Sequence, residues 1–126
     1  MFVVRWLLRR KDGVTHEEFR EHFERSHAPL AEKYIGHLML DYRRIYIDQA
    51  FGRTAVDAAG ESIYSPIEMG WDLISEWVLP DEQTMAKIQA IMTGDVIKEF
   101  HACEEKFLDR ESQVMLRCST VERNRG

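Results

Sequence analysis

Three histidines lie close together in the segment HEEFREHFERSHAPL, residues 16–30. An imidazole is the side chain best suited to moving protons near neutral pH. His16, His22 and His27 are six and five residues apart, so they do not stack on one face of a helix. A metal site is therefore not expected, and a solvated helix face explains the first two better. His27 differs, because a count of 100° per residue places it inside the apolar stripe that contains Phe23.

The surroundings of His27 leave two interpretations open. Pro29 has no amide proton, so the carbonyl of Arg25 loses its usual helical partner and the backbone opens beside the imidazole. A half-buried imidazole with a pKa near neutrality would accept and return a proton at physiological pH. The alternative is a core histidine satisfied by one backbone hydrogen bond.

Two tyrosines and two acids are the other candidates for chemistry. Tyr42 or Tyr46 could donate a hydrogen bond to an enolate oxygen, although either could equally be a sheet residue. Asp72 and Glu76 share one strand face and could orient the imidazole. The alternative is that these acids pair with arginines across the sheet, at Arg43 or Arg44.

Aromatic side chains are numerous enough to line a pocket for an apolar substrate. The candidates are Phe23, Trp6 and Trp77, for each of which core or dimer packing is the default interpretation.

The composition fits an ordinary globular domain and excludes several classes of function. The 126 residues are 44% hydrophobic and 31% charged, which predicts one domain over residues 1–126. A net charge of −5 with scattered basic residues argues against a nucleic-acid partner. No run approaches the ~20 apolar residues of a membrane span. Cys103 and Cys118 are predicted to be free thiols, which suits a reducing cytoplasm.

Hydrophobic periodicity predicts a β-α-β-β-α-β order. A capping box at Thr15 and Glu18 starts the first helix, and Pro29 should break it. Residues 49–69 show no clean period and are expected to be a long loop. The predicted strands are 2–10, 37–48, 70–79 and 113–121, and the predicted helical regions are 16–36 and 81–107, the second interrupted at 93–95.

This order is typical of an α+β, ferredoxin-like fold with a four-stranded antiparallel sheet and both helical regions on one face. The other face keeps large apolar side chains that a monomer would leave in water. A homodimer that packs sheet against sheet is therefore expected.

Four segments, in order, resemble the EthD family. RKDGVTHEEFREHFERSHAPL (10–30) resembles the opening of that family, with its "G-[MV]-[ST]-x-E-E-F" helix start and "R-x-H-x-P-L" motif. YRRIYI (42–47) is similar to the second strand of the family. WDLISEWVLPDEQTMAKI (71–88) is similar to its "D-x-[IV]-x-E-x-W-F" strand and the helix that follows. EEKFLDRESQVML (104–116) is similar to its closing motif, with Glu104 in place of the first aspartate.

The resemblance implies a dimeric α+β barrel that works without a cofactor. Relatives of this kind isomerise lactones or cyclise and dehydrate polyketides, so the chain is expected to be a lyase or isomerase of a small aromatic, polyketide-like or lactone substrate. His27 would abstract a proton next to a carbonyl. Two alternatives stay open: a non-catalytic protein that binds a hydrophobic metabolite for a neighbouring oxygenase, and a haem-binding barrel.

Overall fold

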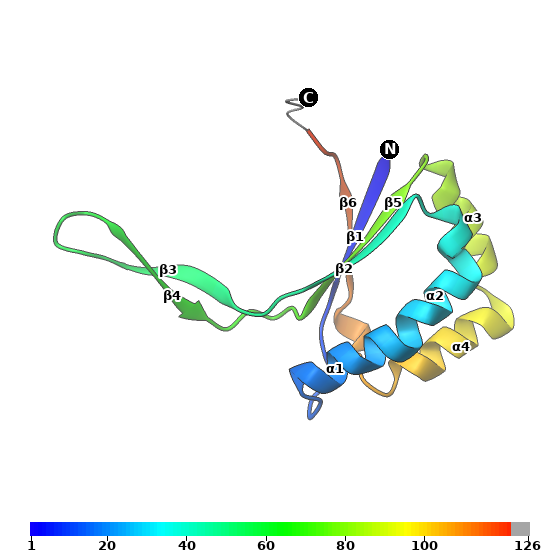
Figure 1. Cartoon of the computed structure of the whole chain (residues 1–126), viewed down its shortest axis with the longest axis horizontal. Helices are drawn as coiled ribbons and strands as arrows, with labels where there is room; N and C mark the ends of the chain where they lie inside the picture. The colour runs from blue at the N-terminus through cyan, green and yellow to red at the C-terminus, as the bar shows by residue number, and fades with distance from the viewer. Residues whose placement is uncertain (122–126) are drawn as a thin grey trace.

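A four-stranded antiparallel sheet forms the centre of the computed structural model, which describes residues 1–121 (Figure 1). The register places Trp6 opposite Ser75 on one side and Met115 on the other. The predicted ferredoxin-like α+β arrangement is confirmed. The strands of this sheet are β1 (Phe2–Leu8), β2 (Asp41–Tyr46), β5 (Leu73–Leu79) and β6 (Val114–Cys118), in the order β2-β5-β1-β6.

The first helical region begins at the predicted capping box. The Thr15 hydroxyl oxygen accepts a hydrogen bond from the Glu18 amide at 3.1 Å, and the hydroxyl donates to the Glu18 carboxylate at 3.0 Å. The predicted break takes the form of a π-helical turn, in which the Ala28 amide donates to the Phe23 carbonyl five residues back. The region runs through α1 (His16–His22), the π turn (Phe23–His27), α2 (Ala28–Ile35) and a 3₁₀ turn (Gly36–Leu38).

The second helical region is interrupted where the sequence predicts. Asp81 accepts a hydrogen bond from the Thr84 amide at 2.9 Å and so starts α3 (Gln83–Ile91). Gly94, with a φ of +56°, begins α4 (Gly94–Glu104) in a left-handed conformation that favours glycine.

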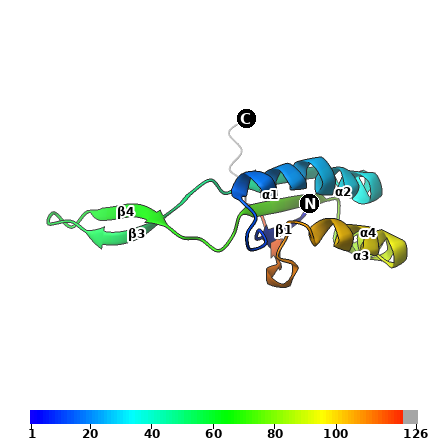
Figure 2. The same cartoon turned by 90° about the horizontal axis from the view of Figure 1, so that it is seen from below.

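Both helical regions cover the same face of the sheet, and the core lies between these helices and the sheet (Figures 1 and 2). Two neighbouring clusters of buried side chains make up this core. One contains Phe19 and Phe23, and the other lies towards α3. The fully buried large side chains are Phe19, Phe23, Phe107, Ile35, Leu73, Leu79 and Val4. Among residues 1–121, no helix has the length and apolar content that a membrane crossing requires.

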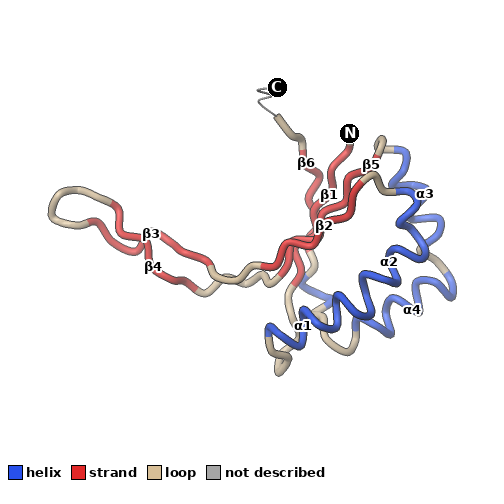
Figure 3. The backbone as a smooth tube through the Cα atoms, in the orientation of Figure 1, coloured by secondary structure: helices blue, strands red, loops and turns tan. Residues whose placement is uncertain are grey.

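Residues 49–69 form a two-stranded hairpin, so the predicted loop is wrong (Figure 3). Strand β3 (Ala50–Val56) pairs with β4 (Ser62–Ile67), with a β-bulge near Thr54. The strands escape notice in the sequence because apolar residues occupy both of their faces, which removes the alternation of a half-buried strand. The hairpin, here called the arm, projects from the side of the sheet opposite to the helices (Figure 1).

The outer face of the sheet carries a row of charges between apolar rows. Glu76 is buried at the centre of this face and accepts from Arg5 at 2.8 Å and from Arg43 at 3.3 Å. On β6 this row ends with an apolar residue, Leu116, which lies opposite Arg5. The predicted pairing of Glu76 with Arg43 is therefore confirmed.

Candidate functional site

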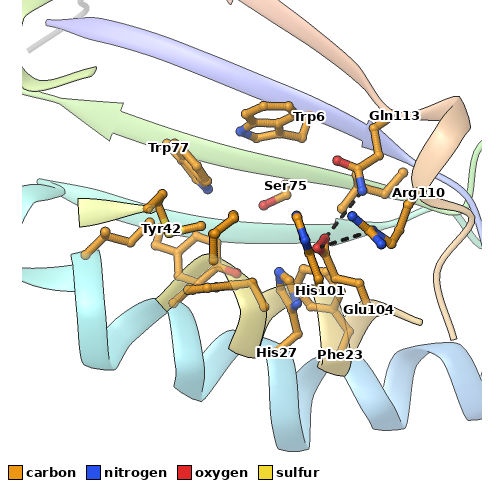
Figure 4. A pocket seen from close by; sticks show the side chains of 16 residues that line it. Trp6, Phe23, His27, Tyr42, Ser75, Trp77, His101, Glu104, Arg110 and Gln113 are labelled. Carbon is orange, nitrogen blue, oxygen red and sulfur yellow. Dashed lines mark hydrogen bonds and ion pairs between the residues drawn. The ribbon is translucent and has the colours of Figure 1, made fainter. Parts of the chain in front are cut away.

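A cavity of about 260 Å³ lies between the sheet and the helices (Figure 4). Its walls come from β1, β2 and β5 on one side and from the π turn, α2 and α4 on the other. The lining residues that carry chemistry or an aromatic ring are Trp6, Phe23, His27, Tyr42, Ser75, Trp77, Phe100, His101, Glu104, Arg110 and Gln113.

The two ends of this cavity differ in chemical character. Trp77 and Tyr42 lie at one end, and Figure 4 shows the polar side chains gathered at the other. There the Glu104 carboxylate accepts a hydrogen bond from the Gln113 amide at 3.4 Å and lies 3.9 Å from the Arg110 guanidinium. An elongated molecule with an aromatic body and a polar head matches this gradient.

His27 projects from the π turn into a largely aromatic environment. The centroid of its ring lies 4.6 Å from that of Phe23, 5.6 Å from Phe100 and 6.1 Å from Phe107. Its Nδ1 atom is buried and has no hydrogen-bond partner within residues 1–121. Because nearly all buried polar atoms in proteins are hydrogen-bonded, this unsatisfied nitrogen is unusual and marks the His27 imidazole as a candidate functional group on the cavity wall.

The pKa of His27 differs from the near-neutral value that the sequence predicts. Burial lowers the pKa to about 4, because the charged imidazolium loses its hydration in this aromatic environment. The imidazole is therefore neutral at physiological pH and free to accept a proton, although it is a weak base until negative charge develops beside it.

Tyr42 and Trp6 offer hydrogen-bond donors to the same cavity. Burial raises the pKa of Tyr42, so its hydroxyl stays protonated and able to donate over the physiological range. The Trp6 Nε1–H is buried and has no acceptor within the described part of the chain. The Trp6 and Trp77 rings meet at a centroid distance of 5.5 Å and form an aromatic wall.

Tyr46 lies outside this cavity, in contrast to its predicted position at the site. Its hydroxyl donates to the Glu24 carboxylate at 2.6 Å, which also accepts from Arg44 at 2.7 Å. The Arg20 guanidinium stacks on the Tyr46 ring at 4.8 Å. Tyr46 thus belongs to an ion-pair cluster on the helix–sheet seam, because it shares the face of Tyr42 but lies four residues further along β2, beyond the cavity.

Asp72 and Glu76 do not reach His27 either. Asp72 accepts from the Arg10 amide at 2.8 Å and from His16 Nδ1 at 2.9 Å, at the end of the sheet where α1 begins. Glu76 points to the outer face, opposite to the cavity. Neither acid can orient the imidazole in this arrangement.

The polar end of the cavity contains residues that sequence reasoning missed. Glu104, Arg110 and Gln113 come from the end of α4, a 3₁₀ turn and the entry to β6, so no local spacing connects them. Burial raises the pKa of Glu104, which the Gln113 and Arg110 contacts only partly offset. The one available signal was the resemblance itself, which places Glu104 at a motif position.

Cys103 and Cys118 are free and half-buried. Burial raises the pKa of Cys103, and the neighbouring Glu104 carboxylate acts in the same direction. Within residues 1–121, no group of three histidine, cysteine or acidic side chains is placed to hold a metal ion.

Comparisons with known proteins place this geometry in a wider group. The family model described as EthD domain matches residues 11–111. The crystal structure of the Arabidopsis thaliana protein At3g17210, from an ensemble refinement, is similar with a TM-score of 0.59 and 15% identity over 98% of this chain and 99% of that one. The solution structure of the same hypothetical protein gives a TM-score of 0.57 and 17% identity over 98% and 90%. No curated protein matches in sequence.

Proposed function

The chain belongs to the EthD family, and from this premise we propose that it is a cofactor-independent lyase or isomerase. It would act by acid/base catalysis on a small aromatic, polyketide-like or lactone substrate. The observation that carries this proposal is the His27 imidazole, which lines a cavity with one aromatic and one polar end and makes no hydrogen bond through its buried Nδ1 within residues 1–121.

His27 would act as the general base. Its neutral imidazole would take a proton from the carbon next to a substrate carbonyl; the electron pair of that C–H bond would form a C=C double bond, and the π pair of the carbonyl would move to its oxygen. The resulting enolate places negative charge beside the imidazolium, which offsets the burial that otherwise keeps the pKa of His27 low. The imidazolium would then return the proton to the product.

Tyr42 would stabilise the enolate oxygen through its hydroxyl. A hydrogen-bond donor placed where charge develops in the transition state contributes more to catalysis than one that binds the ground state equally well. The raised pKa of Tyr42 keeps this donor protonated. Glu104 would bind a hydroxyl of the substrate or pass a proton to it at the polar end.

The size of the cavity limits the substrate. At about 260 Å³ it lies below the ~300–1,000 Å³ of pockets for drug-sized ligands. A molecule of one or two rings would fit against the wall formed by Trp6 and Trp77, with its carbonyl or hydroxyl groups towards Arg110 and Gln113.

A turnover screen tests the proposal. Muconolactones, aromatic polyketide intermediates and aryl β-keto acids would be incubated with wild type, His27→Ala, Tyr42→Phe and the control His22→Ala, with products followed by mass spectrometry. Removal of a general base costs roughly 10²- to 10⁴-fold in rate. We expect that loss in His27→Ala, a smaller loss in Tyr42→Phe and none in His22→Ala. Equal turnover in wild type and His27→Ala would overturn the assigned base.

A second candidate function is a binding protein that holds a hydrophobic metabolite for a neighbouring oxygenase. The aromatic lining and the weak basicity of His27 favour it. It predicts that the same panel is bound without turnover, and that His27→Ala keeps the ligand affinity measured by quenching of Trp6 and Trp77 fluorescence.

A homodimer that packs outer sheet face against outer sheet face completes the proposal. The apolar side chains beside Glu76 support it, since Val114 and Leu116 stay exposed on this face of a single chain. Sedimentation as a monomer at micromolar concentration would contradict it.

A further inference from the structure

Glu104 is an acid on the wall of the cavity that its own chain holds only loosely. Its side chain is 13% exposed, so it has lost most of its hydration. The Gln113 amide donates to its carboxylate at 3.4 Å and the Arg110 guanidinium lies 3.9 Å away, both long for such contacts. By contrast, the structural ion pair between Arg44 and Glu24 has a distance of 2.7 Å. The contacts of Glu104 therefore leave its carboxyl group available to a bound molecule.

The electrostatic surroundings of Glu104 oppose a negative charge there. It is the last residue of α4, where the partial negative charge of the helix end disfavours a carboxylate. Arg110 is shared between Glu104 and Glu105, at 3.9 and 3.8 Å. Burial raises the pKa of Glu104, and the contacts with Gln113 and Arg110 offset this only in part. His101, one turn earlier on α4, also lines the cavity. An acid placed for stability alone would favour the opposite surroundings, so this position indicates proton transfer.

His27 and Glu104 face the same part of the cavity. Phe100, four residues before Glu104 on α4, packs against the His27 ring at a centroid distance of 5.6 Å. Phe107, whose amide donates to the Glu104 carbonyl at 3.2 Å, lies 6.1 Å from the same ring. Figure 4 shows both side chains entering the cavity from its helical side. The general base of the proposed function thus has an acid as its neighbour.

A base and an acid side by side suit the removal of water from a substrate. Burial lowers the pKa of His27 and raises that of Glu104, and such opposite shifts are the usual sign of a base paired with an acid. We propose that Glu104 is a second catalytic residue, the acid that protonates the hydroxyl group leaving from a β-hydroxy carbonyl substrate. This inference rests on the proposed function, in which His27 forms the enolate.

The atoms and electrons of this step balance without a further reactant. When the enolate collapses, its carbonyl re-forms and the C=C pair moves to the bond between the α and β carbons. The β C–O bond breaks with its electron pair on oxygen, which takes the proton of Glu104 and leaves as water. Transfer of one proton through that water, from the His27 imidazolium to the Glu104 carboxylate, restores both groups.

The cavity limits which β-hydroxy carbonyl compounds fit. Its volume of about 260 Å³ and the wall of Trp6 and Trp77 match a compound of one or two rings. The carbonyl oxygen would lie towards the Tyr42 hydroxyl and the β-hydroxyl group towards Glu104. A ring that becomes aromatic when water leaves would add a driving force to the elimination.

Two matched ketones separate the roles of the base and the acid. 3-Hydroxy-1-tetralone loses water to give fluorescent 1-naphthol, whereas 1-tetralone lacks the hydroxyl group and only exchanges hydrogen for deuterium in heavy water. We expect wild type to catalyse both reactions. Glu104→Gln should lose roughly 10²- to 10⁴-fold of the rate of water loss and retain the exchange, which does not use the acid. The control Glu105→Gln, at the exposed neighbouring position, should retain both.

The outcomes distinguish a failure of this inference from a failure of the proposed function. Equal water loss in wild type and Glu104→Gln would overturn the role of Glu104, and so would a wild type that exchanges deuterium but releases no naphthol. Exchange that is absent from wild type, or that persists in His27→Ala, would instead overturn the assigned base and this inference with it.

An infrared titration tests Glu104 independently of turnover. The band of a protonated carboxyl group that titrates above the ordinary glutamate pKa of 4.5 should disappear in Glu104→Gln and remain in Glu105→Gln. A Glu104 carboxyl group that titrates at or below that value would overturn the proposal, because it would hold no proton to give.

Discussion

The His27 cavity and the arm are two places where this chain presents apolar side chains that its core does not use. In the cavity these side chains surround polar atoms and are held by a sheet on one side and helices on the other. In the arm they stand on two strands that only pair with each other. The difference indicates that the cavity is built by folding of one chain, whereas the apolar side chains of the arm stay exposed in that chain.

Truncation of one phenylalanine in each region tests that difference most strongly. Phe107 is fully buried, so Phe107→Ala should lower the free energy of unfolding by ~3–5 kcal/mol in urea denaturation. Phe51→Ala, at a protein concentration low enough to suppress association, should change it by less than ~0.5 kcal/mol. Equal losses would mean that the arm is part of the monomer core.

Acid sensitivity should be a property of the cavity and not of the arm. The folded chain resists protonation of His27 until about pH 4, whereas the unfolded chain protonates it near 6.5. The unfolded state therefore binds more protons between these values. The unfolding free energy should decrease as the pH is lowered through this window, by ~3 kcal/mol for this group.

His27→Gln should remove that part of the pH dependence, and His22→Gln, at an exposed position of α1, should retain it. Urea denaturation at closely spaced pH values measures both. The acidic limb of any turnover should likewise fall near pH 4, so a limb near 6.5 would contradict the low pKa of His27.

Loss of the N-terminal cap of α1, on the cavity side of the comparison, should have a smaller effect on the unfolding free energy. Thr15→Ala removes the hydrogen bond that the Glu18 amide donates and should cost ~1 kcal/mol in unfolding free energy. Thr15→Ser keeps the hydroxyl and should recover most of the loss, measured by thermal unfolding with circular dichroism.

The smallest effect is expected inside the arm. Thr54 and Ser65 share an exposed cross-strand hydrogen bond of 2.8 Å, and Thr54→Ala should cost only ~0.3 kcal/mol in unfolding free energy. A loss above 1 kcal/mol would show that the arm contributes to folding cooperatively rather than as an appendage.

Local signals in the sequence predicted most of the body. The capping box at Thr15, the break at Pro29 and the interruption before Gly94 each act within a few residues, so the helices could be predicted from them. The arm could not be predicted, because apolar residues on both faces remove the two-residue alternation on which strand prediction depends.

The candidate site was predictable only in part. His27, Tyr42, Trp6 and Trp77 meet in one cavity because each lies on an inward face that periodicity identifies. Tyr46 lies four residues from Tyr42 on the same strand, yet it extends beyond the cavity to Glu24. The residues of the polar end come from separate elements that only tertiary packing brings together. No local spacing in the sequence therefore indicates that they meet.

The π turn determines how this helix would respond to the deletion of a single residue. Phe19, Phe23, His27, Ala31 and Ile35 repeat every four residues, and in a regular α-helix such a repeat drifts by about 40° per step. The wider turn at Phe23–His27 offsets much of that drift and keeps the row facing the sheet. Deletion of Ser26 would rotate Ala31 and Ile35 by about 100° relative to Phe19. A single-residue deletion here would thus disturb the cavity more than most substitutions within it.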